Sequence, residues 1–290
     1  AVTELNIEHG TIAGLETETD SFMASCVVLS TGGRAYPSTG STGDGYKLTR
    51  SAGHTITPLY PTESPLVSSE TFISEKILQG ISLRDIRLSV LNSKGKVIIE
   101  HQMDMLFTHF GISGPAALRC SSFINQELAK GEQSVTVQLD SFPEISAAQL
   151  LNDLKNTARD NGKAIKNAFA ALTQERYLLF LLDKVQIDPD MPAKQVSEKQ
   201  LEKFSHILKA FPIQIDKTFP IEKSFVTGGG VQLKEINPKT MESKLTPGLY
   251  MTGELLDING YTGGYNITCA FVTGHVAGSH AAEMASYMKY

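Results

Sequence analysis

Two short apolar runs near opposite ends of the chain each lead into a glycine turn, and this repetition constrains the fold more than any other feature. The first is "CVVL" at residues 26–29, followed by "STGG", and the second is "LYM" at residues 249–251, followed by "TGELLD". Such runs are typical of buried strands in an α/β sheet, where ligands bind beyond the carboxyl ends of the strands. We therefore expect the two ends of the chain to form one α/β domain, which the middle of the chain interrupts.

The middle of the chain, from residue 64 to about 225, has a different pattern. Apolar and polar residues alternate on both sides of Asn92-Ser93-Lys94-Gly95, which predicts a β-hairpin, and "SVTVQLD" at residues 134–140 predicts a further strand. Between them, Gly114-Pro115 is a typical helix start, because proline is tolerated in the first turn. These features predict a small β domain.

Helical spacing dominates the segment that follows. Ser146 with Gln149, and Ser197 with Gln200, have the spacing of capping boxes ahead of an apolar stripe. The second stripe consists of Leu201, Phe204, Leu208 and Phe211. Together with a helix in residues 164–182, these segments can bury their stripes against one another, so we expect them to serve core packing.

Composition argues against several classes of protein and partner. The chain has 290 residues, a net charge of −5 and scattered basic residues, so we expect no nucleic-acid partner. It lacks the run of roughly 18 apolar residues that a membrane span needs, and it lacks a leader-like start, so we expect no membrane partner and a cytoplasmic location. Its three cysteines are far apart and lack ligand spacing, which argues against disulfides and against a metal site.

The stretch "YTGGYNITCAFVTGHVAG" at residues 261–278 combines a glycine pair with the spacing of a buried helix. Gly263 and Gly264 can reach positive φ and lack a Cβ, so a flat ligand can approach the backbone. A helix from about Asn266 then aims its free N–H groups and the positive end of its dipole at that ligand. Small residues that permit close helix packing follow at helical spacing: Gly274, Ala277, Gly278 and Ala281. A purely structural glycine-capped helix is the alternative, but the acidic side chains of "TGELLD" favour a ligand with ribose or ribitol hydroxyls.

Longer segments resemble a known family. They are "STGGRAYPSTGSTGDGY", "LQGISL", "LFTHFGISGPAALR" and the segment from "SFVTGGGVQL" to "TGHVAG". They are similar to the HI0933-like family of bacterial three-domain FAD flavoproteins, which includes NAD(FAD)-utilising dehydrogenases and aminoacetone oxidase. The resemblance implies a fold class of α/β plus β plus α. A Rossmann-like FAD-binding domain (1–63 and 227–290) would be interrupted by a β-barrel-like insert (64–142 and 212–226), which carries a helical subdomain (143–211).

The chain departs from the family pattern at one point. Members begin with a strand, a GxGxxG turn and a helix that hold the ADP half of FAD, and a GGGRCN-like stretch follows; no GxGxxG occurs in this sequence. We expect a truncated or proteolysed protein, a renumbered or partly disordered one being the alternative. FAD is then expected in the full-length protein and is expected to be absent or weakly bound in this chain.

The resemblance also implies the residues around the cofactor. Thr31, Gly32 and Gly33 are expected beside the phosphate-to-ribitol stretch of FAD. Gly253, Glu254 and Asp257 are expected near the ribityl chain and phosphate. Gly264, Tyr265, Asn266 and Ile267 are expected at the flavin ring.

The flavin is expected to do the chemistry, and His109 in "FTHFG" is the best candidate for a side chain that faces substrate. A histidine satisfied by nearby backbone is the alternative, and Thr108 and Ser113 are weaker candidates. The expected function is oxidation of a small donor by FAD, for instance an amine such as aminoacetone, with oxygen as acceptor. One alternative is an NAD(P)H-dependent reductase, and another is a catalytically inert fragment. A small-molecule substrate, with or without NAD(P)H, is the expected partner, and the oligomeric state stays open.

Overall fold

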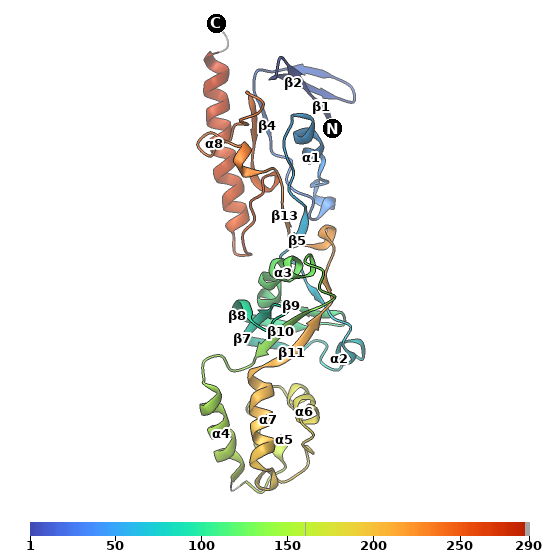
Figure 1. Ribbon diagram of the computed structural model, residues 1–290, viewed down its shortest axis with the longest axis vertical. Helices are drawn as coiled ribbons and strands as arrows, with labels where there is room; N and C mark the ends of the chain where they lie inside the picture. The colour runs from blue at the N-terminus through green and yellow to red at the C-terminus, as the bar shows by residue number, and fades with distance from the viewer. Residues whose placement is uncertain (160, 288–290) are drawn as a thin grey trace. The chain divides into compact units, whose positions relative to one another are not determined.

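Two units divide the chain in the computed structural model, which describes residues 1–159 and 161–287. Unit 1 consists of residues 1–64 and 219–290, and unit 2 consists of residues 65–218. The sequence predicted that the insert would span residues 64–226, so its start lies within one residue of the prediction and its end eight residues earlier. Along the chain, unit 2 thus lies between the two segments of unit 1 (Figure 1).

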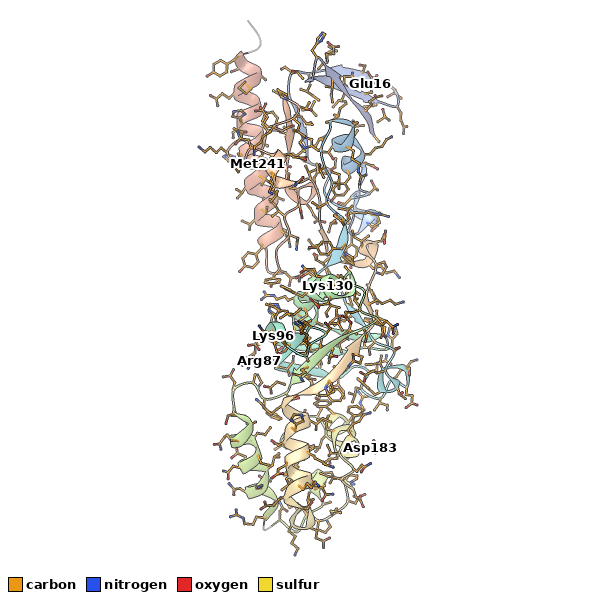
Figure 2. The ribbon with its side chains drawn as sticks, viewed as in Figure 1. Glu16, Arg87, Lys96, Lys130, Asp183 and Met241 are labelled. Carbon is orange, nitrogen blue, oxygen red and sulfur yellow. The ribbon has the colours of Figure 1, made fainter. Side chains whose placement is uncertain are left out.

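Unit 1 begins with a three-stranded antiparallel sheet of β1 (Val2–Glu8), β2 (Thr11–Thr17) and β3 (Ser21–Met23). The turn between the first two strands has positive φ at His9 and Gly10. Glu16 on β2, labelled in Figure 2, accepts hydrogen bonds from the side chains of Asn6 and Ser21. The side chain of Glu16 therefore links all three strands.

A parallel pair of strands forms the centre of unit 1. The pair consists of β4 (Val27–Leu29) and β14 (Leu249–Met251), with Val27 opposite Leu249 and Leu29 opposite Met251. Both apolar runs at the two ends of the chain are thus confirmed as adjacent strands. The pair packs in one apolar core with α1 (Asp44–Ser51), through side chains such as Tyr46 and Leu48. Antiparallel β5 (Tyr60–Thr62) and β13 (Val226–Gly228) complete the strands of the unit.

The long helix α8 (Tyr265–Tyr287) packs beside β4 and β14 (Figure 1). Ala277 and Ala281 are buried against Tyr250, and Met241, labelled in Figure 2, packs on the same cluster. The predicted close packing is therefore right for these alanines. It is wrong for Gly274 and Gly278, because a Cβ at either position would meet no atom within 4 Å. Among the residues that the structure describes, no helix is both long enough and apolar enough to cross a membrane.

Unit 2 is built on a seven-stranded sheet with the order β11-β10-β7-β8-β9-β6-β12. The strands are β6 (Leu66–Val67), β7 (Ser82–Leu91), β8 (Val97–Phe107), β9 (Gly111–Ser113), β10 (Val135–Asp140), β11 (Phe211–Ile215) and β12 (Lys217–Thr218). The hairpin of β7 and β8 is confirmed. Asn92 Oδ1 accepts the backbone N–H groups of Lys94 and Lys96, each at 3.0 Å, and this fixes the turn.

The expected β-barrel is not closed. The edge strands β11 and β12 do not pair with each other, but only Asp216 separates them in the chain. One bent segment therefore pairs first with β10 and then with β6. The bend is held because the Asp216 N–H donates to Val67 O at 2.9 Å, and the Asp216 carboxylate accepts the Ser69 N–H at 2.6 Å.

Some helices of unit 2 pack on this sheet, and others extend its core beyond it. They are α2 (Thr71–Ser74), α3 (Pro115–Leu128), α4 (Ala147–Arg159), α5 (Ile165–Ala168), α6 (Glu175–Lys184) and α7 (Glu198–Lys209). The helix predicted in 164–182 is thus two helices, α5 and α6. The α3 helix begins at Pro115 after Gly114, as predicted. In Figure 1, α4 to α7 gather beyond the start of β11.

The two predicted capping boxes differ. At α7 the box is complete, since Ser197 Oγ accepts the Gln200 N–H and the Gln200 side chain accepts the Ser197 N–H. At α4 only the first half forms, because the Gln149 side chain donates to Asp153 instead. Leu201, Phe204 and Leu208 are buried from α7 as predicted, each stabilising the fold by about 2 kcal/mol. Phe211 was wrongly included in that stripe, because the helix ends at Lys209 and Phe211 starts β11.

Candidate functional site

The carboxyl ends of the parallel strands in unit 1 meet at one place. Ser30 follows β4 and Thr252 follows β14, and their hydroxyl oxygens lie 3.0 Å apart. Each strand then enters a glycine turn with positive φ, 72° at Gly32 and 62° at Gly253. Because parallel strands present their carboxyl ends on the same edge of a sheet, these two turns lie side by side at the edge where α/β sheets generally bind ligands.

A cavity of about 610 Å³ opens at this edge, and all its walls belong to unit 1. It brings together six of the ten predicted cofactor residues: Gly32, Gly253, Glu254, Gly264, Asn266 and Ile267. The aromatic side chains of Phe225, Tyr261 and Phe271 supply much of the apolar lining. Thr31, Gly33, Asp257 and Tyr265 are not part of the lining. The assignment of these residues to a flavin stays a prediction.

The glycine pair ahead of α8 is shaped as the sequence suggested. Gly263 and Gly264 have φ of 119° and 95°, and a Cβ on Gly264 would meet no atom within 4 Å. Glycine is required at Gly264 by its backbone conformation rather than by crowding. The first intrahelical bond runs from the Thr268 N–H to Gly264 O at 2.9 Å. The N–H groups of residues 265–267 therefore lie at the free end of the helix, where the helix dipole favours negative charge.

Gly33 lies where three segments, at residues 33–35, 227 and 254, are joined by hydrogen bonds that we call the interlock. The Glu254 carboxylate accepts the Thr227 N–H at 2.8 Å, and Thr227 Oγ1 accepts the N–H groups of Arg34 and Ala35 at 2.8 and 3.0 Å. A Cβ on Gly33 would collide with both Thr227 Oγ1 and Glu254 Oε1. Gly33 is therefore explained by this close approach. Glu254 has one oxygen engaged in the interlock and lines the cavity as well.

Sequence reasoning missed one residue that fixes the cavity walls. Thr273 is buried on α8, and its Oγ1 accepts the Gly253 N–H at 2.9 Å. This bond ties the turn after β14 to the helix α8, and both line the cavity. The signal in the sequence was a single threonine on an otherwise apolar or small helical face, which gives no indication of its partner.

The other predicted residues lie around the site. Thr31 packs against α1, where a Cβ on Gly45 would overlap its Oγ1. Tyr46 of α1 donates through its hydroxyl to Glu254 O at 3.2 Å, and burial with the nearby charges of Glu254 and Asp257 raises its pKa. Tyr265 is 64% exposed.

His109 lies in unit 2, exposed in the turn between β8 and β9, with its ring edge-on to Phe110. Thr108 Oγ1 accepts the Phe110 N–H at 3.3 Å, and this contact gives Thr108 a structural role within the turn. Ser113 ends β9. The roles of these three residues toward a substrate stay predictions. Within residues 1–159 and 161–287, no group of three His, Cys, Asp or Glu side chains has an arrangement that could hold a metal ion.

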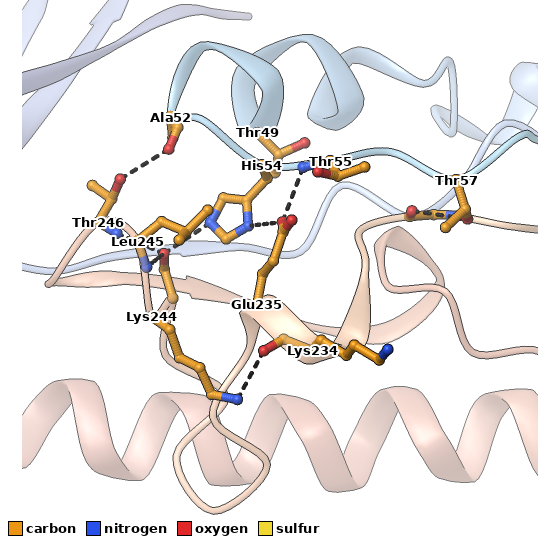
Figure 3. A network of polar contacts seen from close by, with 12 residues as sticks. Thr49, Ala52, His54, Thr55, Thr57, Lys234, Glu235, Lys244, Leu245 and Thr246 are labelled. Carbon is orange, nitrogen blue, oxygen red and sulfur yellow. Dashed lines mark hydrogen bonds and ion pairs between the residues drawn. The ribbon is translucent and has the colours of Figure 1, made fainter.

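A buried polar network in unit 1 lies outside the cavity lining (Figure 3). His54 Nδ1 lies 3.0 Å from Glu235 Oε2, and His54 Nε2 lies 2.8 Å from Ser243 Oγ. Glu235 also accepts the Thr55 N–H at 2.9 Å. Burial lowers the pKa of His54 although Glu235 opposes this. Burial raises the pKa of Glu235, but hydrogen bonds from Thr55 and His54 outweigh it, so this pKa is lower than usual.

Comparisons with known proteins give the following relatives. The chain is 34% identical over 265 residues to a 3-dehydro-bile acid delta(4,6)-reductase of Clostridium scindens, covering 90% of this chain and 63% of the relative. It is 30% identical over 246 residues to a ribosomal RNA dihydrouridine synthase of Escherichia coli, covering 84% of this chain and 58% of that relative. The protein of the same description from Haemophilus influenzae is 28% identical over 263 residues, covering 90% of this chain and 61% of that protein. The chain thus spans about three fifths of the length of these curated relatives.

A variant of E. coli quinol fumarate reductase FrdA aligns with all of this chain and 45% of its own, at 16% identity and a TM-score of 0.39. That likeness is too weak to carry an argument. Residues 60–226 match the family described as HI0933-like protein barrel and H2TH domain. Since this match covers more than half of the 290 residues, the chain belongs to the HI0933-like family, as its motifs predicted.

Proposed function

We propose that this chain supplies the flavin-ring part of an FAD-dependent oxidoreductase, which reduces a carbon–carbon double bond conjugated with a carbonyl group in a small molecule. The observation that carries the proposal is the cavity where two glycine turns and the start of α8 meet. Its volume of about 610 Å³ lies within the range usual for cofactor and ligand sites. Family membership and the reductase relative support the oxidoreductase class.

The residues present fit the ring half of a flavin. Apolar walls from Phe225, Ile267 and Phe271 suit a flat tricyclic ring, and Gly264 offers open space above its backbone. The free N–H groups at the start of α8 stabilise the negative charge that a reduced flavin carries at its N1/O2 edge. When bound, the flavin supplies hydride transfer between a reduced nicotinamide and the substrate. The hydroxyls of Ser30 and Thr252 stand at the same edge, where their oxygens can accept hydrogen bonds from the ribityl chain.

The names of the relatives favour reduction over amine oxidation. A 3-dehydro, delta(4,6) bile acid has a carbonyl beside a conjugated double bond. Dihydrouridine is uridine with two hydrogens added across the double bond next to its C4 carbonyl. For this protein we propose that a hydride from NAD(P)H adds to the double-bond carbon remote from the carbonyl, and that a proton adds to the other carbon of that double bond. Oxidation of an amine such as aminoacetone by oxygen has no support from these names.

A small molecule is the proposed substrate rather than RNA. The chain has 26 basic and 31 acidic residues, while binding of a phosphate backbone depends on a concentrated positive surface. An rRNA substrate is therefore an alternative outcome of the test. His109 remains the side chain that we propose faces the substrate.

The test uses the full-length protein purified with its bound flavin. The flavin is identified after release, and the protein is then reduced anaerobically with NADPH or NADH while the absorbance at the flavin band is followed. The reduced protein is mixed separately with a 3-oxo-4,6-diene steroid acid, with rRNA, and with oxygen. In a parallel experiment the oxidised protein is mixed anaerobically with aminoacetone.

We expect reduction by a nicotinamide and rapid reoxidation by the steroid, with one equivalent of reduced steroid per flavin. If rRNA reoxidises the flavin and the steroid does not, the substrate is RNA rather than a small molecule. Rapid flavin reduction by aminoacetone, with no reaction of the steroid, would overturn the proposed direction. A purified full-length protein that contains no flavin and binds none would overturn the cofactor assignment.

A further inference from the structure

The side chain of Asn266 forms two hydrogen bonds with one residue of the loop before α8. Asn266 Oδ1 accepts the Gly260 N–H at 2.7 Å, and Asn266 Nδ2 donates to Gly260 O at 2.8 Å. The side-chain amide thus forms the same pair of hydrogen bonds with Gly260 that a facing residue of an antiparallel strand would form. This pairing closes residues 260–266 into a loop whose two ends are held together.

The closed loop is part of the cavity wall. Tyr261, Thr262, Gly263 and Gly264 all line the cavity, and so does Asn266. Three glycines in seven residues would leave this segment with a large conformational entropy in the absence of a constraint. Gly260 also packs on the first turn of the helix, since a Cβ there would lie 3.0 Å from the Cβ of Tyr265. Two short hydrogen bonds and this contact offset that entropy.

We propose that Asn266 is a positioning residue, which presets the loop of residues 260–264 for the ligand of the cavity. The proposal rests on the proposed function in that the ligand is taken to be the flavin of FAD. Asn266 was predicted to touch the flavin ring directly, but its side-chain oxygen and nitrogen are each engaged with Gly260. Its effect on the cofactor therefore passes through the shape of the loop and through the orientation of the N–H groups at the helix start.

Two substitutions separate this role from that of a helix-terminal residue. Asn266→Ala removes both hydrogen bonds to Gly260. Asn266→Asp keeps an acceptor for the Gly260 N–H but places a carboxylate oxygen against Gly260 O, which opens the loop. Aspartate in the first turn of a helix is favourable, so this variant does not weaken α8 itself. Thr268→Ala is the matched control, since Thr268 is exposed on the same turn and does not line the cavity.

The experiment has two readouts in the full-length protein. One is hydrogen exchange at the Gly260 amide in the flavin-free protein, and the other is the Kd for FAD by titration. Far-ultraviolet circular dichroism and thermal melting of each variant check that it is folded. Loss of two hydrogen bonds is expected to raise both the exchange rate and the Kd about tenfold or more in Asn266→Ala and Asn266→Asp. Thr268→Ala is expected to change neither.

Unchanged exchange at Gly260 in Asn266→Ala would overturn the inference, because the loop would then keep its shape without the amide. Faster exchange with an unchanged Kd would also overturn it, because the loop would then have no influence on the cofactor. A parent protein that binds no FAD would refute the proposed function and, with it, the role of Asn266 toward FAD. In that case the exchange readout still decides whether Asn266 closes the loop.

Discussion

Lowering the pH from neutral should destabilise unit 1, because His54 is buried as a neutral imidazole. Ser243 Oγ accepts the N–H groups of Leu245 and Thr246 at 3.0 and 2.8 Å, so its own proton points to His54 Nε2. The imidazole proton is thereby placed on Nδ1, where it is donated to Glu235. A second proton on Nε2 would face the Ser243 hydroxyl, whose acceptor positions are taken. This geometry, in a side chain that is 0% exposed, agrees with the lowered pKa of His54.

The sign and size of the effect follow from proton linkage. A histidine in the unfolded chain has a pKa of about 6.5. Between that value and the lower pKa of the folded protein, the unfolded state binds a proton that the folded state does not. The free energy of unfolding therefore falls as the pH falls below about 6.5, by up to about 1.4 kcal/mol per pH unit. The loss stops once the pH is below the pKa of His54 in the folded protein, and the full stabilisation is present above about pH 7.

Native-state hydrogen exchange at the β14 amides measures this free energy for unit 1 alone, after correction for intrinsic exchange rates. His54→Asn keeps a donor near the position of Nδ1 and loses the bond to Ser243, so it should be about 1–2 kcal/mol less stable at pH 7.5. Its difference from the parent should shrink between pH 7.5 and 5.5, because asparagine does not titrate. His275→Asn, at an exposed position of α8, serves as control. A difference between parent and His54→Asn that stays constant over this range would refute the reasoning.

Substitutions at four further positions test the cavity and the residues predicted around it, each in the full-length protein. Gly264→Val should strain a backbone at φ 95° by about 1–3 kcal/mol and weaken FAD binding more than it lowers the melting temperature of the flavin-free protein; unchanged affinity would remove the flavin from this turn. Thr273→Val should lower stability by about 1–2 kcal/mol through the lost acceptor for Gly253, whereas Thr273→Ser should restore it in the same melting experiment. Gly33→Ala should cost about 1–3 kcal/mol in urea unfolding, since its Cβ would collide with Thr227 and Glu254, and no loss would contradict the interlock. His109→Ala should leave the FAD content unchanged and alter turnover or substrate affinity; equal kinetics would return His109 to a structural role.

Local signals in the sequence predicted the elements that depend on near neighbours. The hairpin at residues 92–95 depends on Asn92, whose side chain bonds the backbone two and four residues later. The capping box at Ser197 depends on a glutamine three residues away. The helix boundary before Phe211 was missed because an apolar residue at helical spacing fits a strand start equally well. There, pairing of Phe211 with Leu139 of β10 decides the structure.

The sequence could not predict the contacts between segments that lie far apart in the chain. The glycine turns could be placed at one cavity from pattern and family resemblance. The interlock of Gly33 with Thr227 and Glu254 joins residues about 200 positions apart, and no spacing in the sequence reveals it. Asn266 was assigned to the flavin from the family resemblance, and its pairing with Gly260 was missed because that pairing depends on the geometry of the loop. The bend at Asp216 likewise depends on Val67 and Ser69, which lie far along the chain.

The position of unit 2 within the chain of unit 1 has a consequence for the order of folding. Formation of the β4–β14 pair must bring together segments separated by roughly 220 residues, and the length-dependent entropy of closing such a loop is about 5 kcal/mol if it is unfolded. The residues that flank unit 2 are adjacent in the folded unit 1, where Ser64 Oγ donates to Phe219 O at 3.2 Å. In unit 2, β6 and β12 at the two ends of the insert pair with each other, so folding of unit 2 by itself brings residues 64 and 219 close together. Pulsed hydrogen exchange during refolding should therefore protect β7 and β8 before β14. Folding of the insert would then shorten the loop that unit 1 must close and so favour the assembly of the domain that the insert interrupts.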